Sequence, residues 1–191
     1  MLMPGHHLNP IRNRADNFFK VFALLEKKNK KFYNIIETGC MRKDHGTLSF
    51  GDDGASTFIF DLFVNFYNGC VLSVDINNKN VKDAKEIVSN KTKVFQMDSV
   101  KFLWNLPKNF SIDLLYLDSF DLELDNPHPS SLHHIKELCA VVKNLNNTII
   151  VVDDHKVSSD QKSSKGAYVK DFMLNIGAKV LFENYQIGFY L

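Results

Sequence analysis

The segment NIIETGC, residues Asn34–Cys40, predicts a short buried strand that ends in an acidic residue and a glycine. The glycine lets the backbone come close to a ligand, because it has no Cβ atom. The carboxylate at the strand end can accept hydrogen bonds from ribose hydroxyls or from an ammonium group. Strands of this kind that lead into a helix are where α/β sheets place nucleotide-like ligands.

Outward from this segment, strands and helices are predicted to alternate along the chain of 191 residues. The predicted strands span residues 32–36, 70–74, 93–96, 112–117, 148–152, 179–183 and 187–191. The predicted helices span residues 14–30, 58–67, 79–89, 100–106, 130–145 and 166–175. Ser56 or Thr57 is expected to cap the second helix. This alternation predicts a largely parallel sheet, to which the last two strands add an antiparallel pair.

The composition is that of a globular protein, with 45% hydrophobic and 24% charged residues. Lysine and arginine number 23 and aspartate and glutamate 22, so the net charge of +1 does not favour a nucleic-acid partner. No segment is long and apolar enough to span a membrane, and a signal-peptide core is lacking, so we expect a cytoplasmic protein without a membrane partner. The three cysteines lack CxxC spacing and are expected to be reduced.

Acidic residues follow the predicted strands at their carboxyl ends. They are Glu37, Asp75, Asp98, Asp118 and the pair Asp153–Asp154. In an open parallel sheet these ends share one edge, and ligands bind at that edge. The sequence therefore predicts a carboxylate-rich ligand site there.

From about Phe32 to the C-terminus, the sequence resembles the class I S-adenosylmethionine (SAM)-dependent methyltransferases. In that family the first strand ends in an acid-x-Gly motif, which residues 37–39 match. The second strand ends in an acid that holds the ribose hydroxyls, and Asp75 matches it. An Asp-Ser pair after the third strand contacts the adenine, and residues 98–99 match this pair.

The resemblance implies a Rossmann-like three-layer α/β sandwich around a seven-stranded, mostly parallel sheet. Its strand order would be 3-2-1-4-5-7-6, with the last strand antiparallel. Residues 32–191 would form this domain, preceded by an N-terminal extension and helix over residues 1–31. The implied cofactor is SAM, and its candidate ligands are Glu37, Thr38, Gly39, Ser56, Asp75, Ile76, Asp98, Ser99 and Asp118.

The sequence departs from the family pattern after Gly39. The glycine-rich turn of the family normally continues within a few residues, whereas here the next candidate turn, residues 54–57, follows an insertion over residues 43–53. Glu37 and Asp75 are therefore 38 positions apart (75 minus 37), against about 20 from motif to acid in the dinucleotide-binding fingerprint. We interpret the insertion as a loop over the cofactor pocket.

Asp118, Asp153 and Asp154 are similar in placement to the metal ligands of the metal-dependent small-molecule O-methyltransferases, a branch that includes the macrolide-sugar enzymes. Three carboxylates from two strand ends suit a hard divalent cation such as Mg²⁺. His155 or His128 is the candidate catalytic base, because histidine titrates near neutral pH. Simpler roles stay open, since Asp154 can cap a turn and His155 can be a satisfied polar residue at a strand end.

The expected function is methyl transfer from SAM to an oxygen of a small molecule, with or without a divalent metal. Two alternatives stay open: a metal-dependent oxygenase on the same fold, similar to the cephalosporin hydroxylases, and a non-catalytic binding module. The predicted N-terminal helix carries Phe18, Phe19 and Phe22. We expect these side chains to cover the sheet, to close the pocket, or to pack on a second subunit in a homodimer.

Overall fold

The computed structural model of the chain describes residues 10–42, 55–156 and 164–191, so the predicted insertion over 43–53 lies outside the described residues. The strands are β1 (Tyr33–Thr38), β2 (Gly69–Asp75), β3 (Thr92–Gln96), β4 (Leu114–Leu117), β5 (Ile149–Val152), β6 (Lys179–Glu183) and β7 (Ile187–Tyr190). They form one sheet in the order β3-β2-β1-β4-β5-β7-β6. Strand β7 is antiparallel to β5 and β6, and the pairs among β1 to β5 are parallel. The predicted sheet is confirmed.

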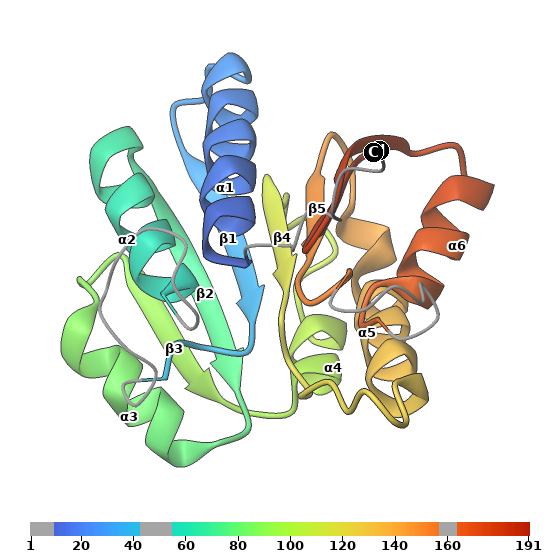
Figure 1. Cartoon of the computed structure of the whole chain (residues 1–191). Coiled ribbons are helices and arrows are strands. Elements are labelled where there is room, and N and C mark those ends of the chain that lie inside the picture. Colours follow the sequence, from blue (N-terminus) through green and yellow to red (C-terminus); the bar gives the residue numbers. More distant parts are fainter. Residues whose placement is uncertain (1–9, 43–54, 157–163) are drawn as a thin grey trace, which may run out of the picture.

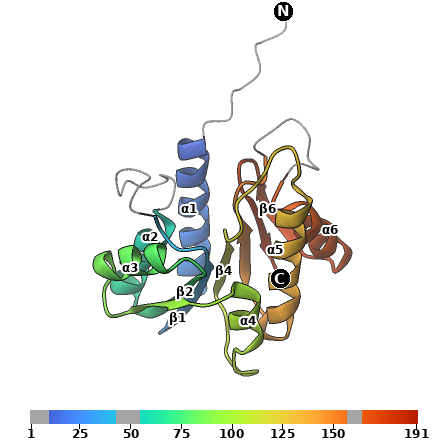
Figure 2. The same ribbon diagram turned by 90° about the horizontal axis from the view of Figure 1, so that it is seen from below.

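Helices cover both faces of this sheet, which makes the three predicted layers. The helices are α1 (Pro10–Lys27), α2 (Ser56–Tyr67), α3 (Asn78–Ile87), α4 (Ser99–Trp104), α5 (His128–Val141) and α6 (Ala167–Asn175). A short 3₁₀ turn, Val142–Asn144, continues α5. Helices α1, α2 and α3 lie on one face of the sheet, and α4, α5 and α6 lie on the other (Figures 1 and 2).

Helix α1 packs its apolar side on the sheet. Phe18 is buried, and its ring lies 5.6 Å from that of Phe60 in α2 and 5.8 Å from that of Tyr116 in β4. Phe22 stacks on Phe63 at 4.8 Å, whereas Phe19 is 64% exposed. Phe18 and Phe22 therefore help to cover the sheet, which is one of the three expected roles.

On the opposite face, the three remaining helices cover the centre of the sheet. Leu103 of α4, Leu138 of α5 and Met173 of α6 are fully buried in one cluster with Leu115 and Ile150. Because helices cover both faces, the central strands have continuous apolar sequences, LLYL in β4 and IIVV in β5.

Two element ends differ from the sequence predictions for an identifiable reason. Strand β1 continues through Glu37 and Thr38, because hydroxyl groups satisfy the buried Glu37 carboxylate. The expectation that Ser56 or Thr57 caps α2 is wrong. Ala55 precedes this helix without a side-chain cap, and both hydroxyls donate to Glu37 instead.

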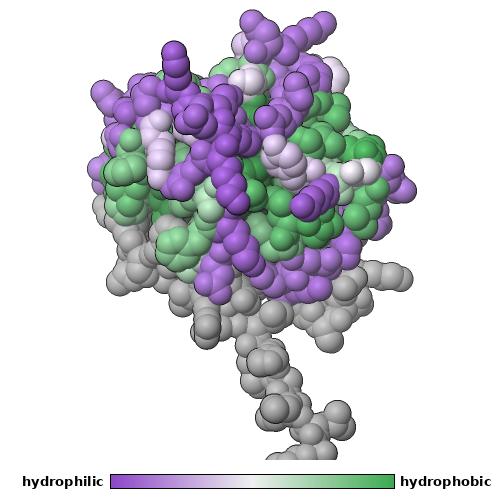
Figure 3. Space-filling view, turned by 90° about the horizontal axis from the view of Figure 1, so that it is seen from above, coloured by the Kyte–Doolittle hydropathy of each residue, from purple (hydrophilic) through white to green (hydrophobic). Residues whose placement is uncertain are grey.

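The described surface mixes hydrophilic and hydrophobic side chains, and Figure 3 shows both kinds side by side on one face. No helix within the described ranges combines the length and the apolar character needed to cross a membrane. All three cysteines lie in those ranges and are free thiols, as expected.

Candidate functional site

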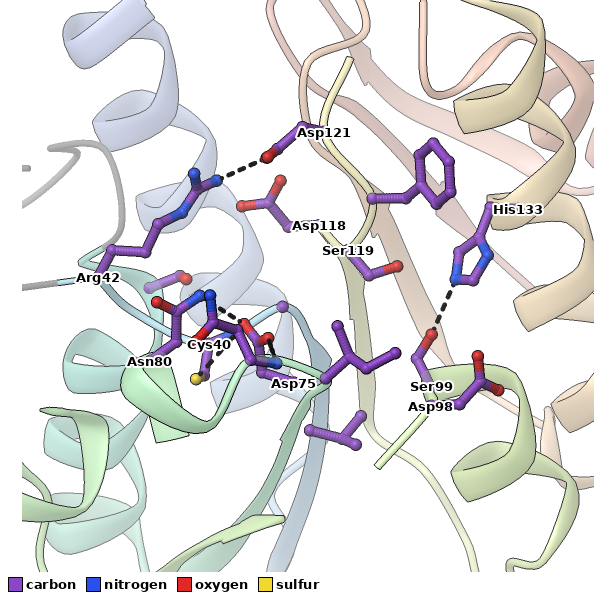
Figure 4. A pocket seen from close by; sticks show the side chains of 16 residues that line it. Cys40, Arg42, Asp75, Asn80, Asp98, Ser99, Asp118, Ser119, Asp121 and His133 are labelled. Atoms are coloured by element: carbon purple, nitrogen blue, oxygen red, sulfur yellow. Dashed lines mark hydrogen bonds and ion pairs between the residues drawn. The ribbon is translucent and has the colours of Figure 1, made fainter. Parts of the chain in front are cut away.

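A cavity of about 500 Å³ lies where β1, β2 and β4 end. Most of the predicted cofactor ligands line it: Gly39, Ser56, Asp75, Ile76, Asp98, Ser99 and Asp118. Glu37 and Thr38 do not line it, because both side chains are fully buried. The cavity therefore lies at the edge of the sheet that the strand-end acids predicted (Figure 4).

Gly39 brings the end of β1 against the end of β4. Its φ is +80°, and its N–H donates to the carbonyl of Val74 at 2.8 Å. A Cβ atom here would lie 2.5 Å from the carbonyl oxygen of Asp118. Both the backbone conformation and the close approach require glycine.

The Asp75 carboxylate is fixed at the cavity wall by four donors, one of which is the Cys40 thiol, whose Sγ lies 3.6 Å from Oδ2. Oδ2 accepts from the Cys40 N–H and from the Asn80 amide, each at 3.1 Å, and Oδ1 accepts from the Asn77 N–H at 2.7 Å. Figure 4 shows Cys40 and Asn80 directed toward Asp75. Since a carboxylate has about four lone-pair sites, Oδ1 keeps one for a ligand hydroxyl, whereas Oδ2 is already occupied by donors from Cys40 and Asn80.

Glu37 holds three elements together beneath the cavity. Its carboxylate accepts from the hydroxyls of Ser56 and Thr57 in α2 and of Ser73 in β2, at 2.5, 2.7 and 2.5 Å. Burial raises the pKa of Glu37 to about 7, although these three hydroxyls act in the opposite direction. Thr38 Oγ1 has no hydrogen-bond partner among the described residues.

We predict that Glu37 makes folding stability depend on pH. Because the pKa of Glu37 is about 7 in the folded chain and about 4.5 otherwise, the folded state binds its proton more tightly. This stabilisation is complete below pH 4.5 and is lost as the pH rises through 7, a fall of about 3 kcal/mol in the free energy of unfolding. Urea unfolding at pH 5 and pH 8 would measure it. Glu37→Gln should remove the difference, and an equal pH dependence in both proteins would contradict the prediction.

The opposite wall of the cavity is built by the start of α4 and by α5. The Asp98 carboxylate caps α4 by accepting from the Lys101 N–H at 2.8 Å. Ser99 Oγ lies 2.9 Å from Nε2 of His133, which Figure 4 shows directed toward it. Glu137, one turn further along α5, is fully buried and lies 3.4 Å from the same nitrogen. Ser99 and Glu137 therefore fix the orientation of an imidazole that faces the cavity.

The segment after β4 forms the remaining wall. Phe120 has a φ of +55° and is 51% exposed, and its carbonyl accepts from Ser130 Oγ at 3.1 Å. Asp121 pairs with Arg42 at 2.9 Å, and Figure 4 shows Arg42 pointing toward it. This pair joins the end of the β1 segment to the segment after β4. An exposed ring held in a left-handed backbone conformation offers a bound ligand an apolar contact.

The three predicted metal ligands are paired with two cations of the chain. Arg14 Nε lies 3.0 Å from Asp153 Oδ2, and Lys165 Nζ lies 2.8 Å from Asp118 Oδ1 and 2.9 Å from Asp154 Oδ2. Although burial alone would lower the pKa of Lys165, the neighbouring carboxylates raise it. Within the described ranges, no three His, Cys, Asp or Glu side chains are arranged to hold a metal ion. The predicted divalent-metal site is not supported, because the carboxylates already have cationic partners.

Neither histidine predicted as the catalytic base lies in the wall of the cavity. His155 is buried, with Nδ1 3.3 Å from Ser164 Oγ and Nε2 3.4 Å from Glu183. Burial lowers its pKa, although Glu183 acts in the opposite direction. His128 begins α5 and contacts the Tyr168 hydroxyl through Nδ1. His128 therefore lies against α6, and His155 lies against the hairpin of β6 and β7.

Several cavity side chains lie outside the predicted set of ligands. They are Cys40, Arg42, Val74, Asn77, Asn80, Ser119, Phe120, Asp121 and His133. Two signals point to some of them: residues 119–121 directly follow Asp118 at the end of β4, and His133 and Glu137 have the i,i+4 spacing of a helical pair. Arg42 carries no such signal, because its partner Asp121 lies 79 positions further along the chain. Asn80 lies in α3, five positions after its partner Asp75, and the sequence does not show that its amide turns back to that carboxylate.

Solved structures of methyltransferases are similar to this chain. The delta-N METTL16 methyltransferase domain has a TM-score of 0.56 and 12% identity, covering 98% of this chain and 84% of that one. The human methyltransferase 10 domain containing protein has a TM-score of 0.55 and 13% identity, covering 98% and 84%. A Streptococcus mutans protein described as a methyltransferase, in complex with SAH, has a TM-score of 0.52 and 9% identity, covering 98% and 99%.

No protein-family model and no curated protein matches the sequence. The similarity to the solved structures is therefore one of architecture rather than of sequence, since the identities are 9% to 13%. It extends over nearly all of this chain, including the antiparallel β7. The chain has the fold of the class I methyltransferases.

Proposed function

We propose that this chain is a SAM-dependent methyltransferase that binds its cofactor in the cavity at the ends of β1, β2 and β4. The observation that carries the proposal is the Asp75 carboxylate, held at the cavity wall by the backbone N–H groups of Cys40 and Asn77. An acceptor fixed in this way at a strand end suits the hydroxyl pair of a ribose. The absence of a Cβ atom at Gly39 leaves the backbone accessible beside it.

The remaining walls suit the other parts of the cofactor. Ile76 is 73% exposed and lines the cavity with Asp98 and Ser99, so an adenine ring there would meet one apolar side chain and two polar ones. The Asp118 carboxylate, on the β4 side, would lie near the sulfonium cation, and its ion pair with Lys165 at 2.8 Å offsets part of its attraction for that cation. Each of these placements follows from the fit of chemical groups to the cavity walls.

When bound, the cofactor would supply an activated methyl group, and its transfer to an acceptor hydroxyl would leave S-adenosylhomocysteine and release one proton to solvent. The chain has to align the two reactants and exclude water. Phe120, Asp121 and Arg42 form the wall at which an acceptor would enter. We propose a small-molecule acceptor, because a cavity of about 500 Å³ is of ordinary size for small ligands and the net charge of +1 does not favour nucleic acid. Methylation at oxygen rests on the resemblance to the small-molecule O-methyltransferases alone.

Isothermal titration of the unmodified chain with SAM, with S-adenosylhomocysteine and with NAD⁺ tests the proposed cofactor. We expect both sulfur compounds to bind with micromolar dissociation constants and NAD⁺ to give no heat, because the fold lacks a GxGxxG turn for a pyrophosphate. If neither sulfur compound binds, the methyltransferase proposal fails, and a binding module for another ligand becomes the better interpretation.

A further inference from the structure

A group of charged side chains lies at the ends of β4 and β5 and includes one residue of helix α1. Its acidic members are Asp118, Asp153 and Asp154, and its cations are Arg14 and Lys165. The two cationic side chains are only 6% and 1% exposed. Buried charges of this kind persist only when they are paired, so each cation has to be balanced within the group.

The carboxylate oxygens of the pair after β5 already have donors. Asp153 Oδ2 accepts from Arg14 Nε at 3.0 Å and from the Tyr116 hydroxyl at 2.8 Å. Asp154 Oδ1 accepts from the Tyr185 hydroxyl at 2.5 Å, and Asp154 Oδ2 faces Lys165. A divalent ion needs several oxygens converging on it at about 2.0–2.6 Å. Here these oxygens converge on a guanidinium, an ammonium and two hydroxyls.

The backbone fixes the position of Lys165. Its N–H donates to the carbonyl of Asp154 at 3.3 Å, and the carbonyl of the preceding Ser164 accepts from Ser131 Oγ of α5. The following Gly166 is tightly packed, since a Cβ atom there would lie 2.7 Å from Nδ1 of His155. The ammonium is therefore held in place from both sides of the residue.

We propose that Lys165, together with Arg14, is an internal cation that occupies the place a divalent metal would take at this edge of the sheet. Lys165 Nζ bridges the strand ends by contacting Asp118 after β4 and Asp154 after β5. Asp118 lines the cavity, so Lys165 acts as a positioning residue that holds this carboxylate on the cavity wall. The inference does not require SAM to be the ligand of the cavity.

Binding of Mn²⁺ to the chain without any cofactor tests this proposal. In the unmodified protein, we expect the melting temperature to be unchanged by millimolar Mn²⁺, because the place is filled. Lys165→Ala leaves both space and uncompensated carboxylates, so Mn²⁺ should bind at one site and raise the melting temperature by about 5 °C when present in large excess over its dissociation constant.

Three further variants test whether a gain of Mn²⁺ binding comes from the vacated space at Lys165 or only from the loss of a positive charge. Lys165→Met also removes the charge but fills the space, and it should gain no Mn²⁺ site. Lys170→Ala removes a lysine that pairs with Glu183 at 2.8 Å on the same side of the sheet, and it should remain indifferent to Mn²⁺. Adding Asp154→Asn to Lys165→Ala should abolish the gained site, because it removes a bridging oxygen.

Two results would overturn the proposal. Saturable Mn²⁺ binding by the unmodified chain that is lost in Asp154→Asn would show that the carboxylates are metal ligands despite Lys165. If the Lys165→Ala protein folds but neither binds Mn²⁺ nor gains melting temperature from it, the ammonium does not occupy a site that could hold a cation. The first result needs no lysine variant, so the proposal can fail even if Lys165→Ala does not fold. Neither result depends on SAM, so both are distinct from a failure of the proposed function.

Discussion

Asp75→Ala is expected to weaken the affinity for SAM by about 100-fold or more, because two hydrogen bonds to a charged group contribute about 1.5–3 kcal/mol each. The substitution removes the carboxylate that Cys40, Asn77 and Asn80 hold at the cavity wall. Calorimetric titration of both proteins with SAM would measure the change.

The folded state should survive this substitution. Cys40 is 5% exposed, so its N–H loses a buried acceptor, at a cost of about 1–3 kcal/mol. Asp171→Ala is the matched control, because Asp171 is an exposed acid on α6 outside the wall of the cavity. A normal affinity in a folded Asp75→Ala protein would mean that the ribose lies elsewhere.

Gly39→Ala is the substitution for which we expect the largest loss of stability. A left-handed φ of +80° costs an alanine about 1–2 kcal/mol, and the added Cβ lies 2.5 Å from a backbone oxygen that has no free rotation. Overpacking of this kind typically costs a further 1–3 kcal/mol or so. Urea unfolding should therefore show a loss of about 2–5 kcal/mol.

Gly177→Ala separates the two contributions. Gly177 has almost the same φ, +81°, but its Cβ position has no atom within 4 Å. Gly177→Ala should therefore lower the free energy of unfolding only by the cost of the left-handed backbone conformation, about 1–2 kcal/mol. Equal losses in the two variants would show that β1 and β4 can move apart at Gly39, and that the close approach is not required for folding.

The sheet and most of the cavity could be predicted from the sequence, because their signals are local. Each of the five parallel strands ends in or just before an acidic segment, and parallel strands bring their carboxyl ends to one edge. Asp75, Asp98 and Asp118 therefore reach the cavity without any knowledge of packing. Glu37 carries the same signal yet is buried, because three hydroxyls from α2 and β2 surround it. The sequence pattern does not contain that environment.

The partners of the strand-end acids could not be predicted for a related reason. Arg14 meets Asp153 across 139 positions, and Lys165 meets Asp118 across 47. Both cations lie in polar sequence, where a lysine or arginine is ordinarily solvated. Three neighbouring carboxylates suggest a metal site when no positively charged partner is known. Only the tertiary packing shows that the compensating positive charges come from the chain itself.

The contacts that attach α1 to the rest of the fold affect how the chain folds during its synthesis on the ribosome. Asn17 donates to Asn184 and Gln186, which are 167 and 169 positions further along the chain. At a translation rate of about 5–20 residues per second, α1 waits roughly 10–30 seconds for these partners to emerge. During that time Arg14 also lacks Asp153, and the nascent helix has only its hydrophobic side to hold it. We expect α1 to dock fully only after the hairpin of β6 and β7 has left the exit tunnel.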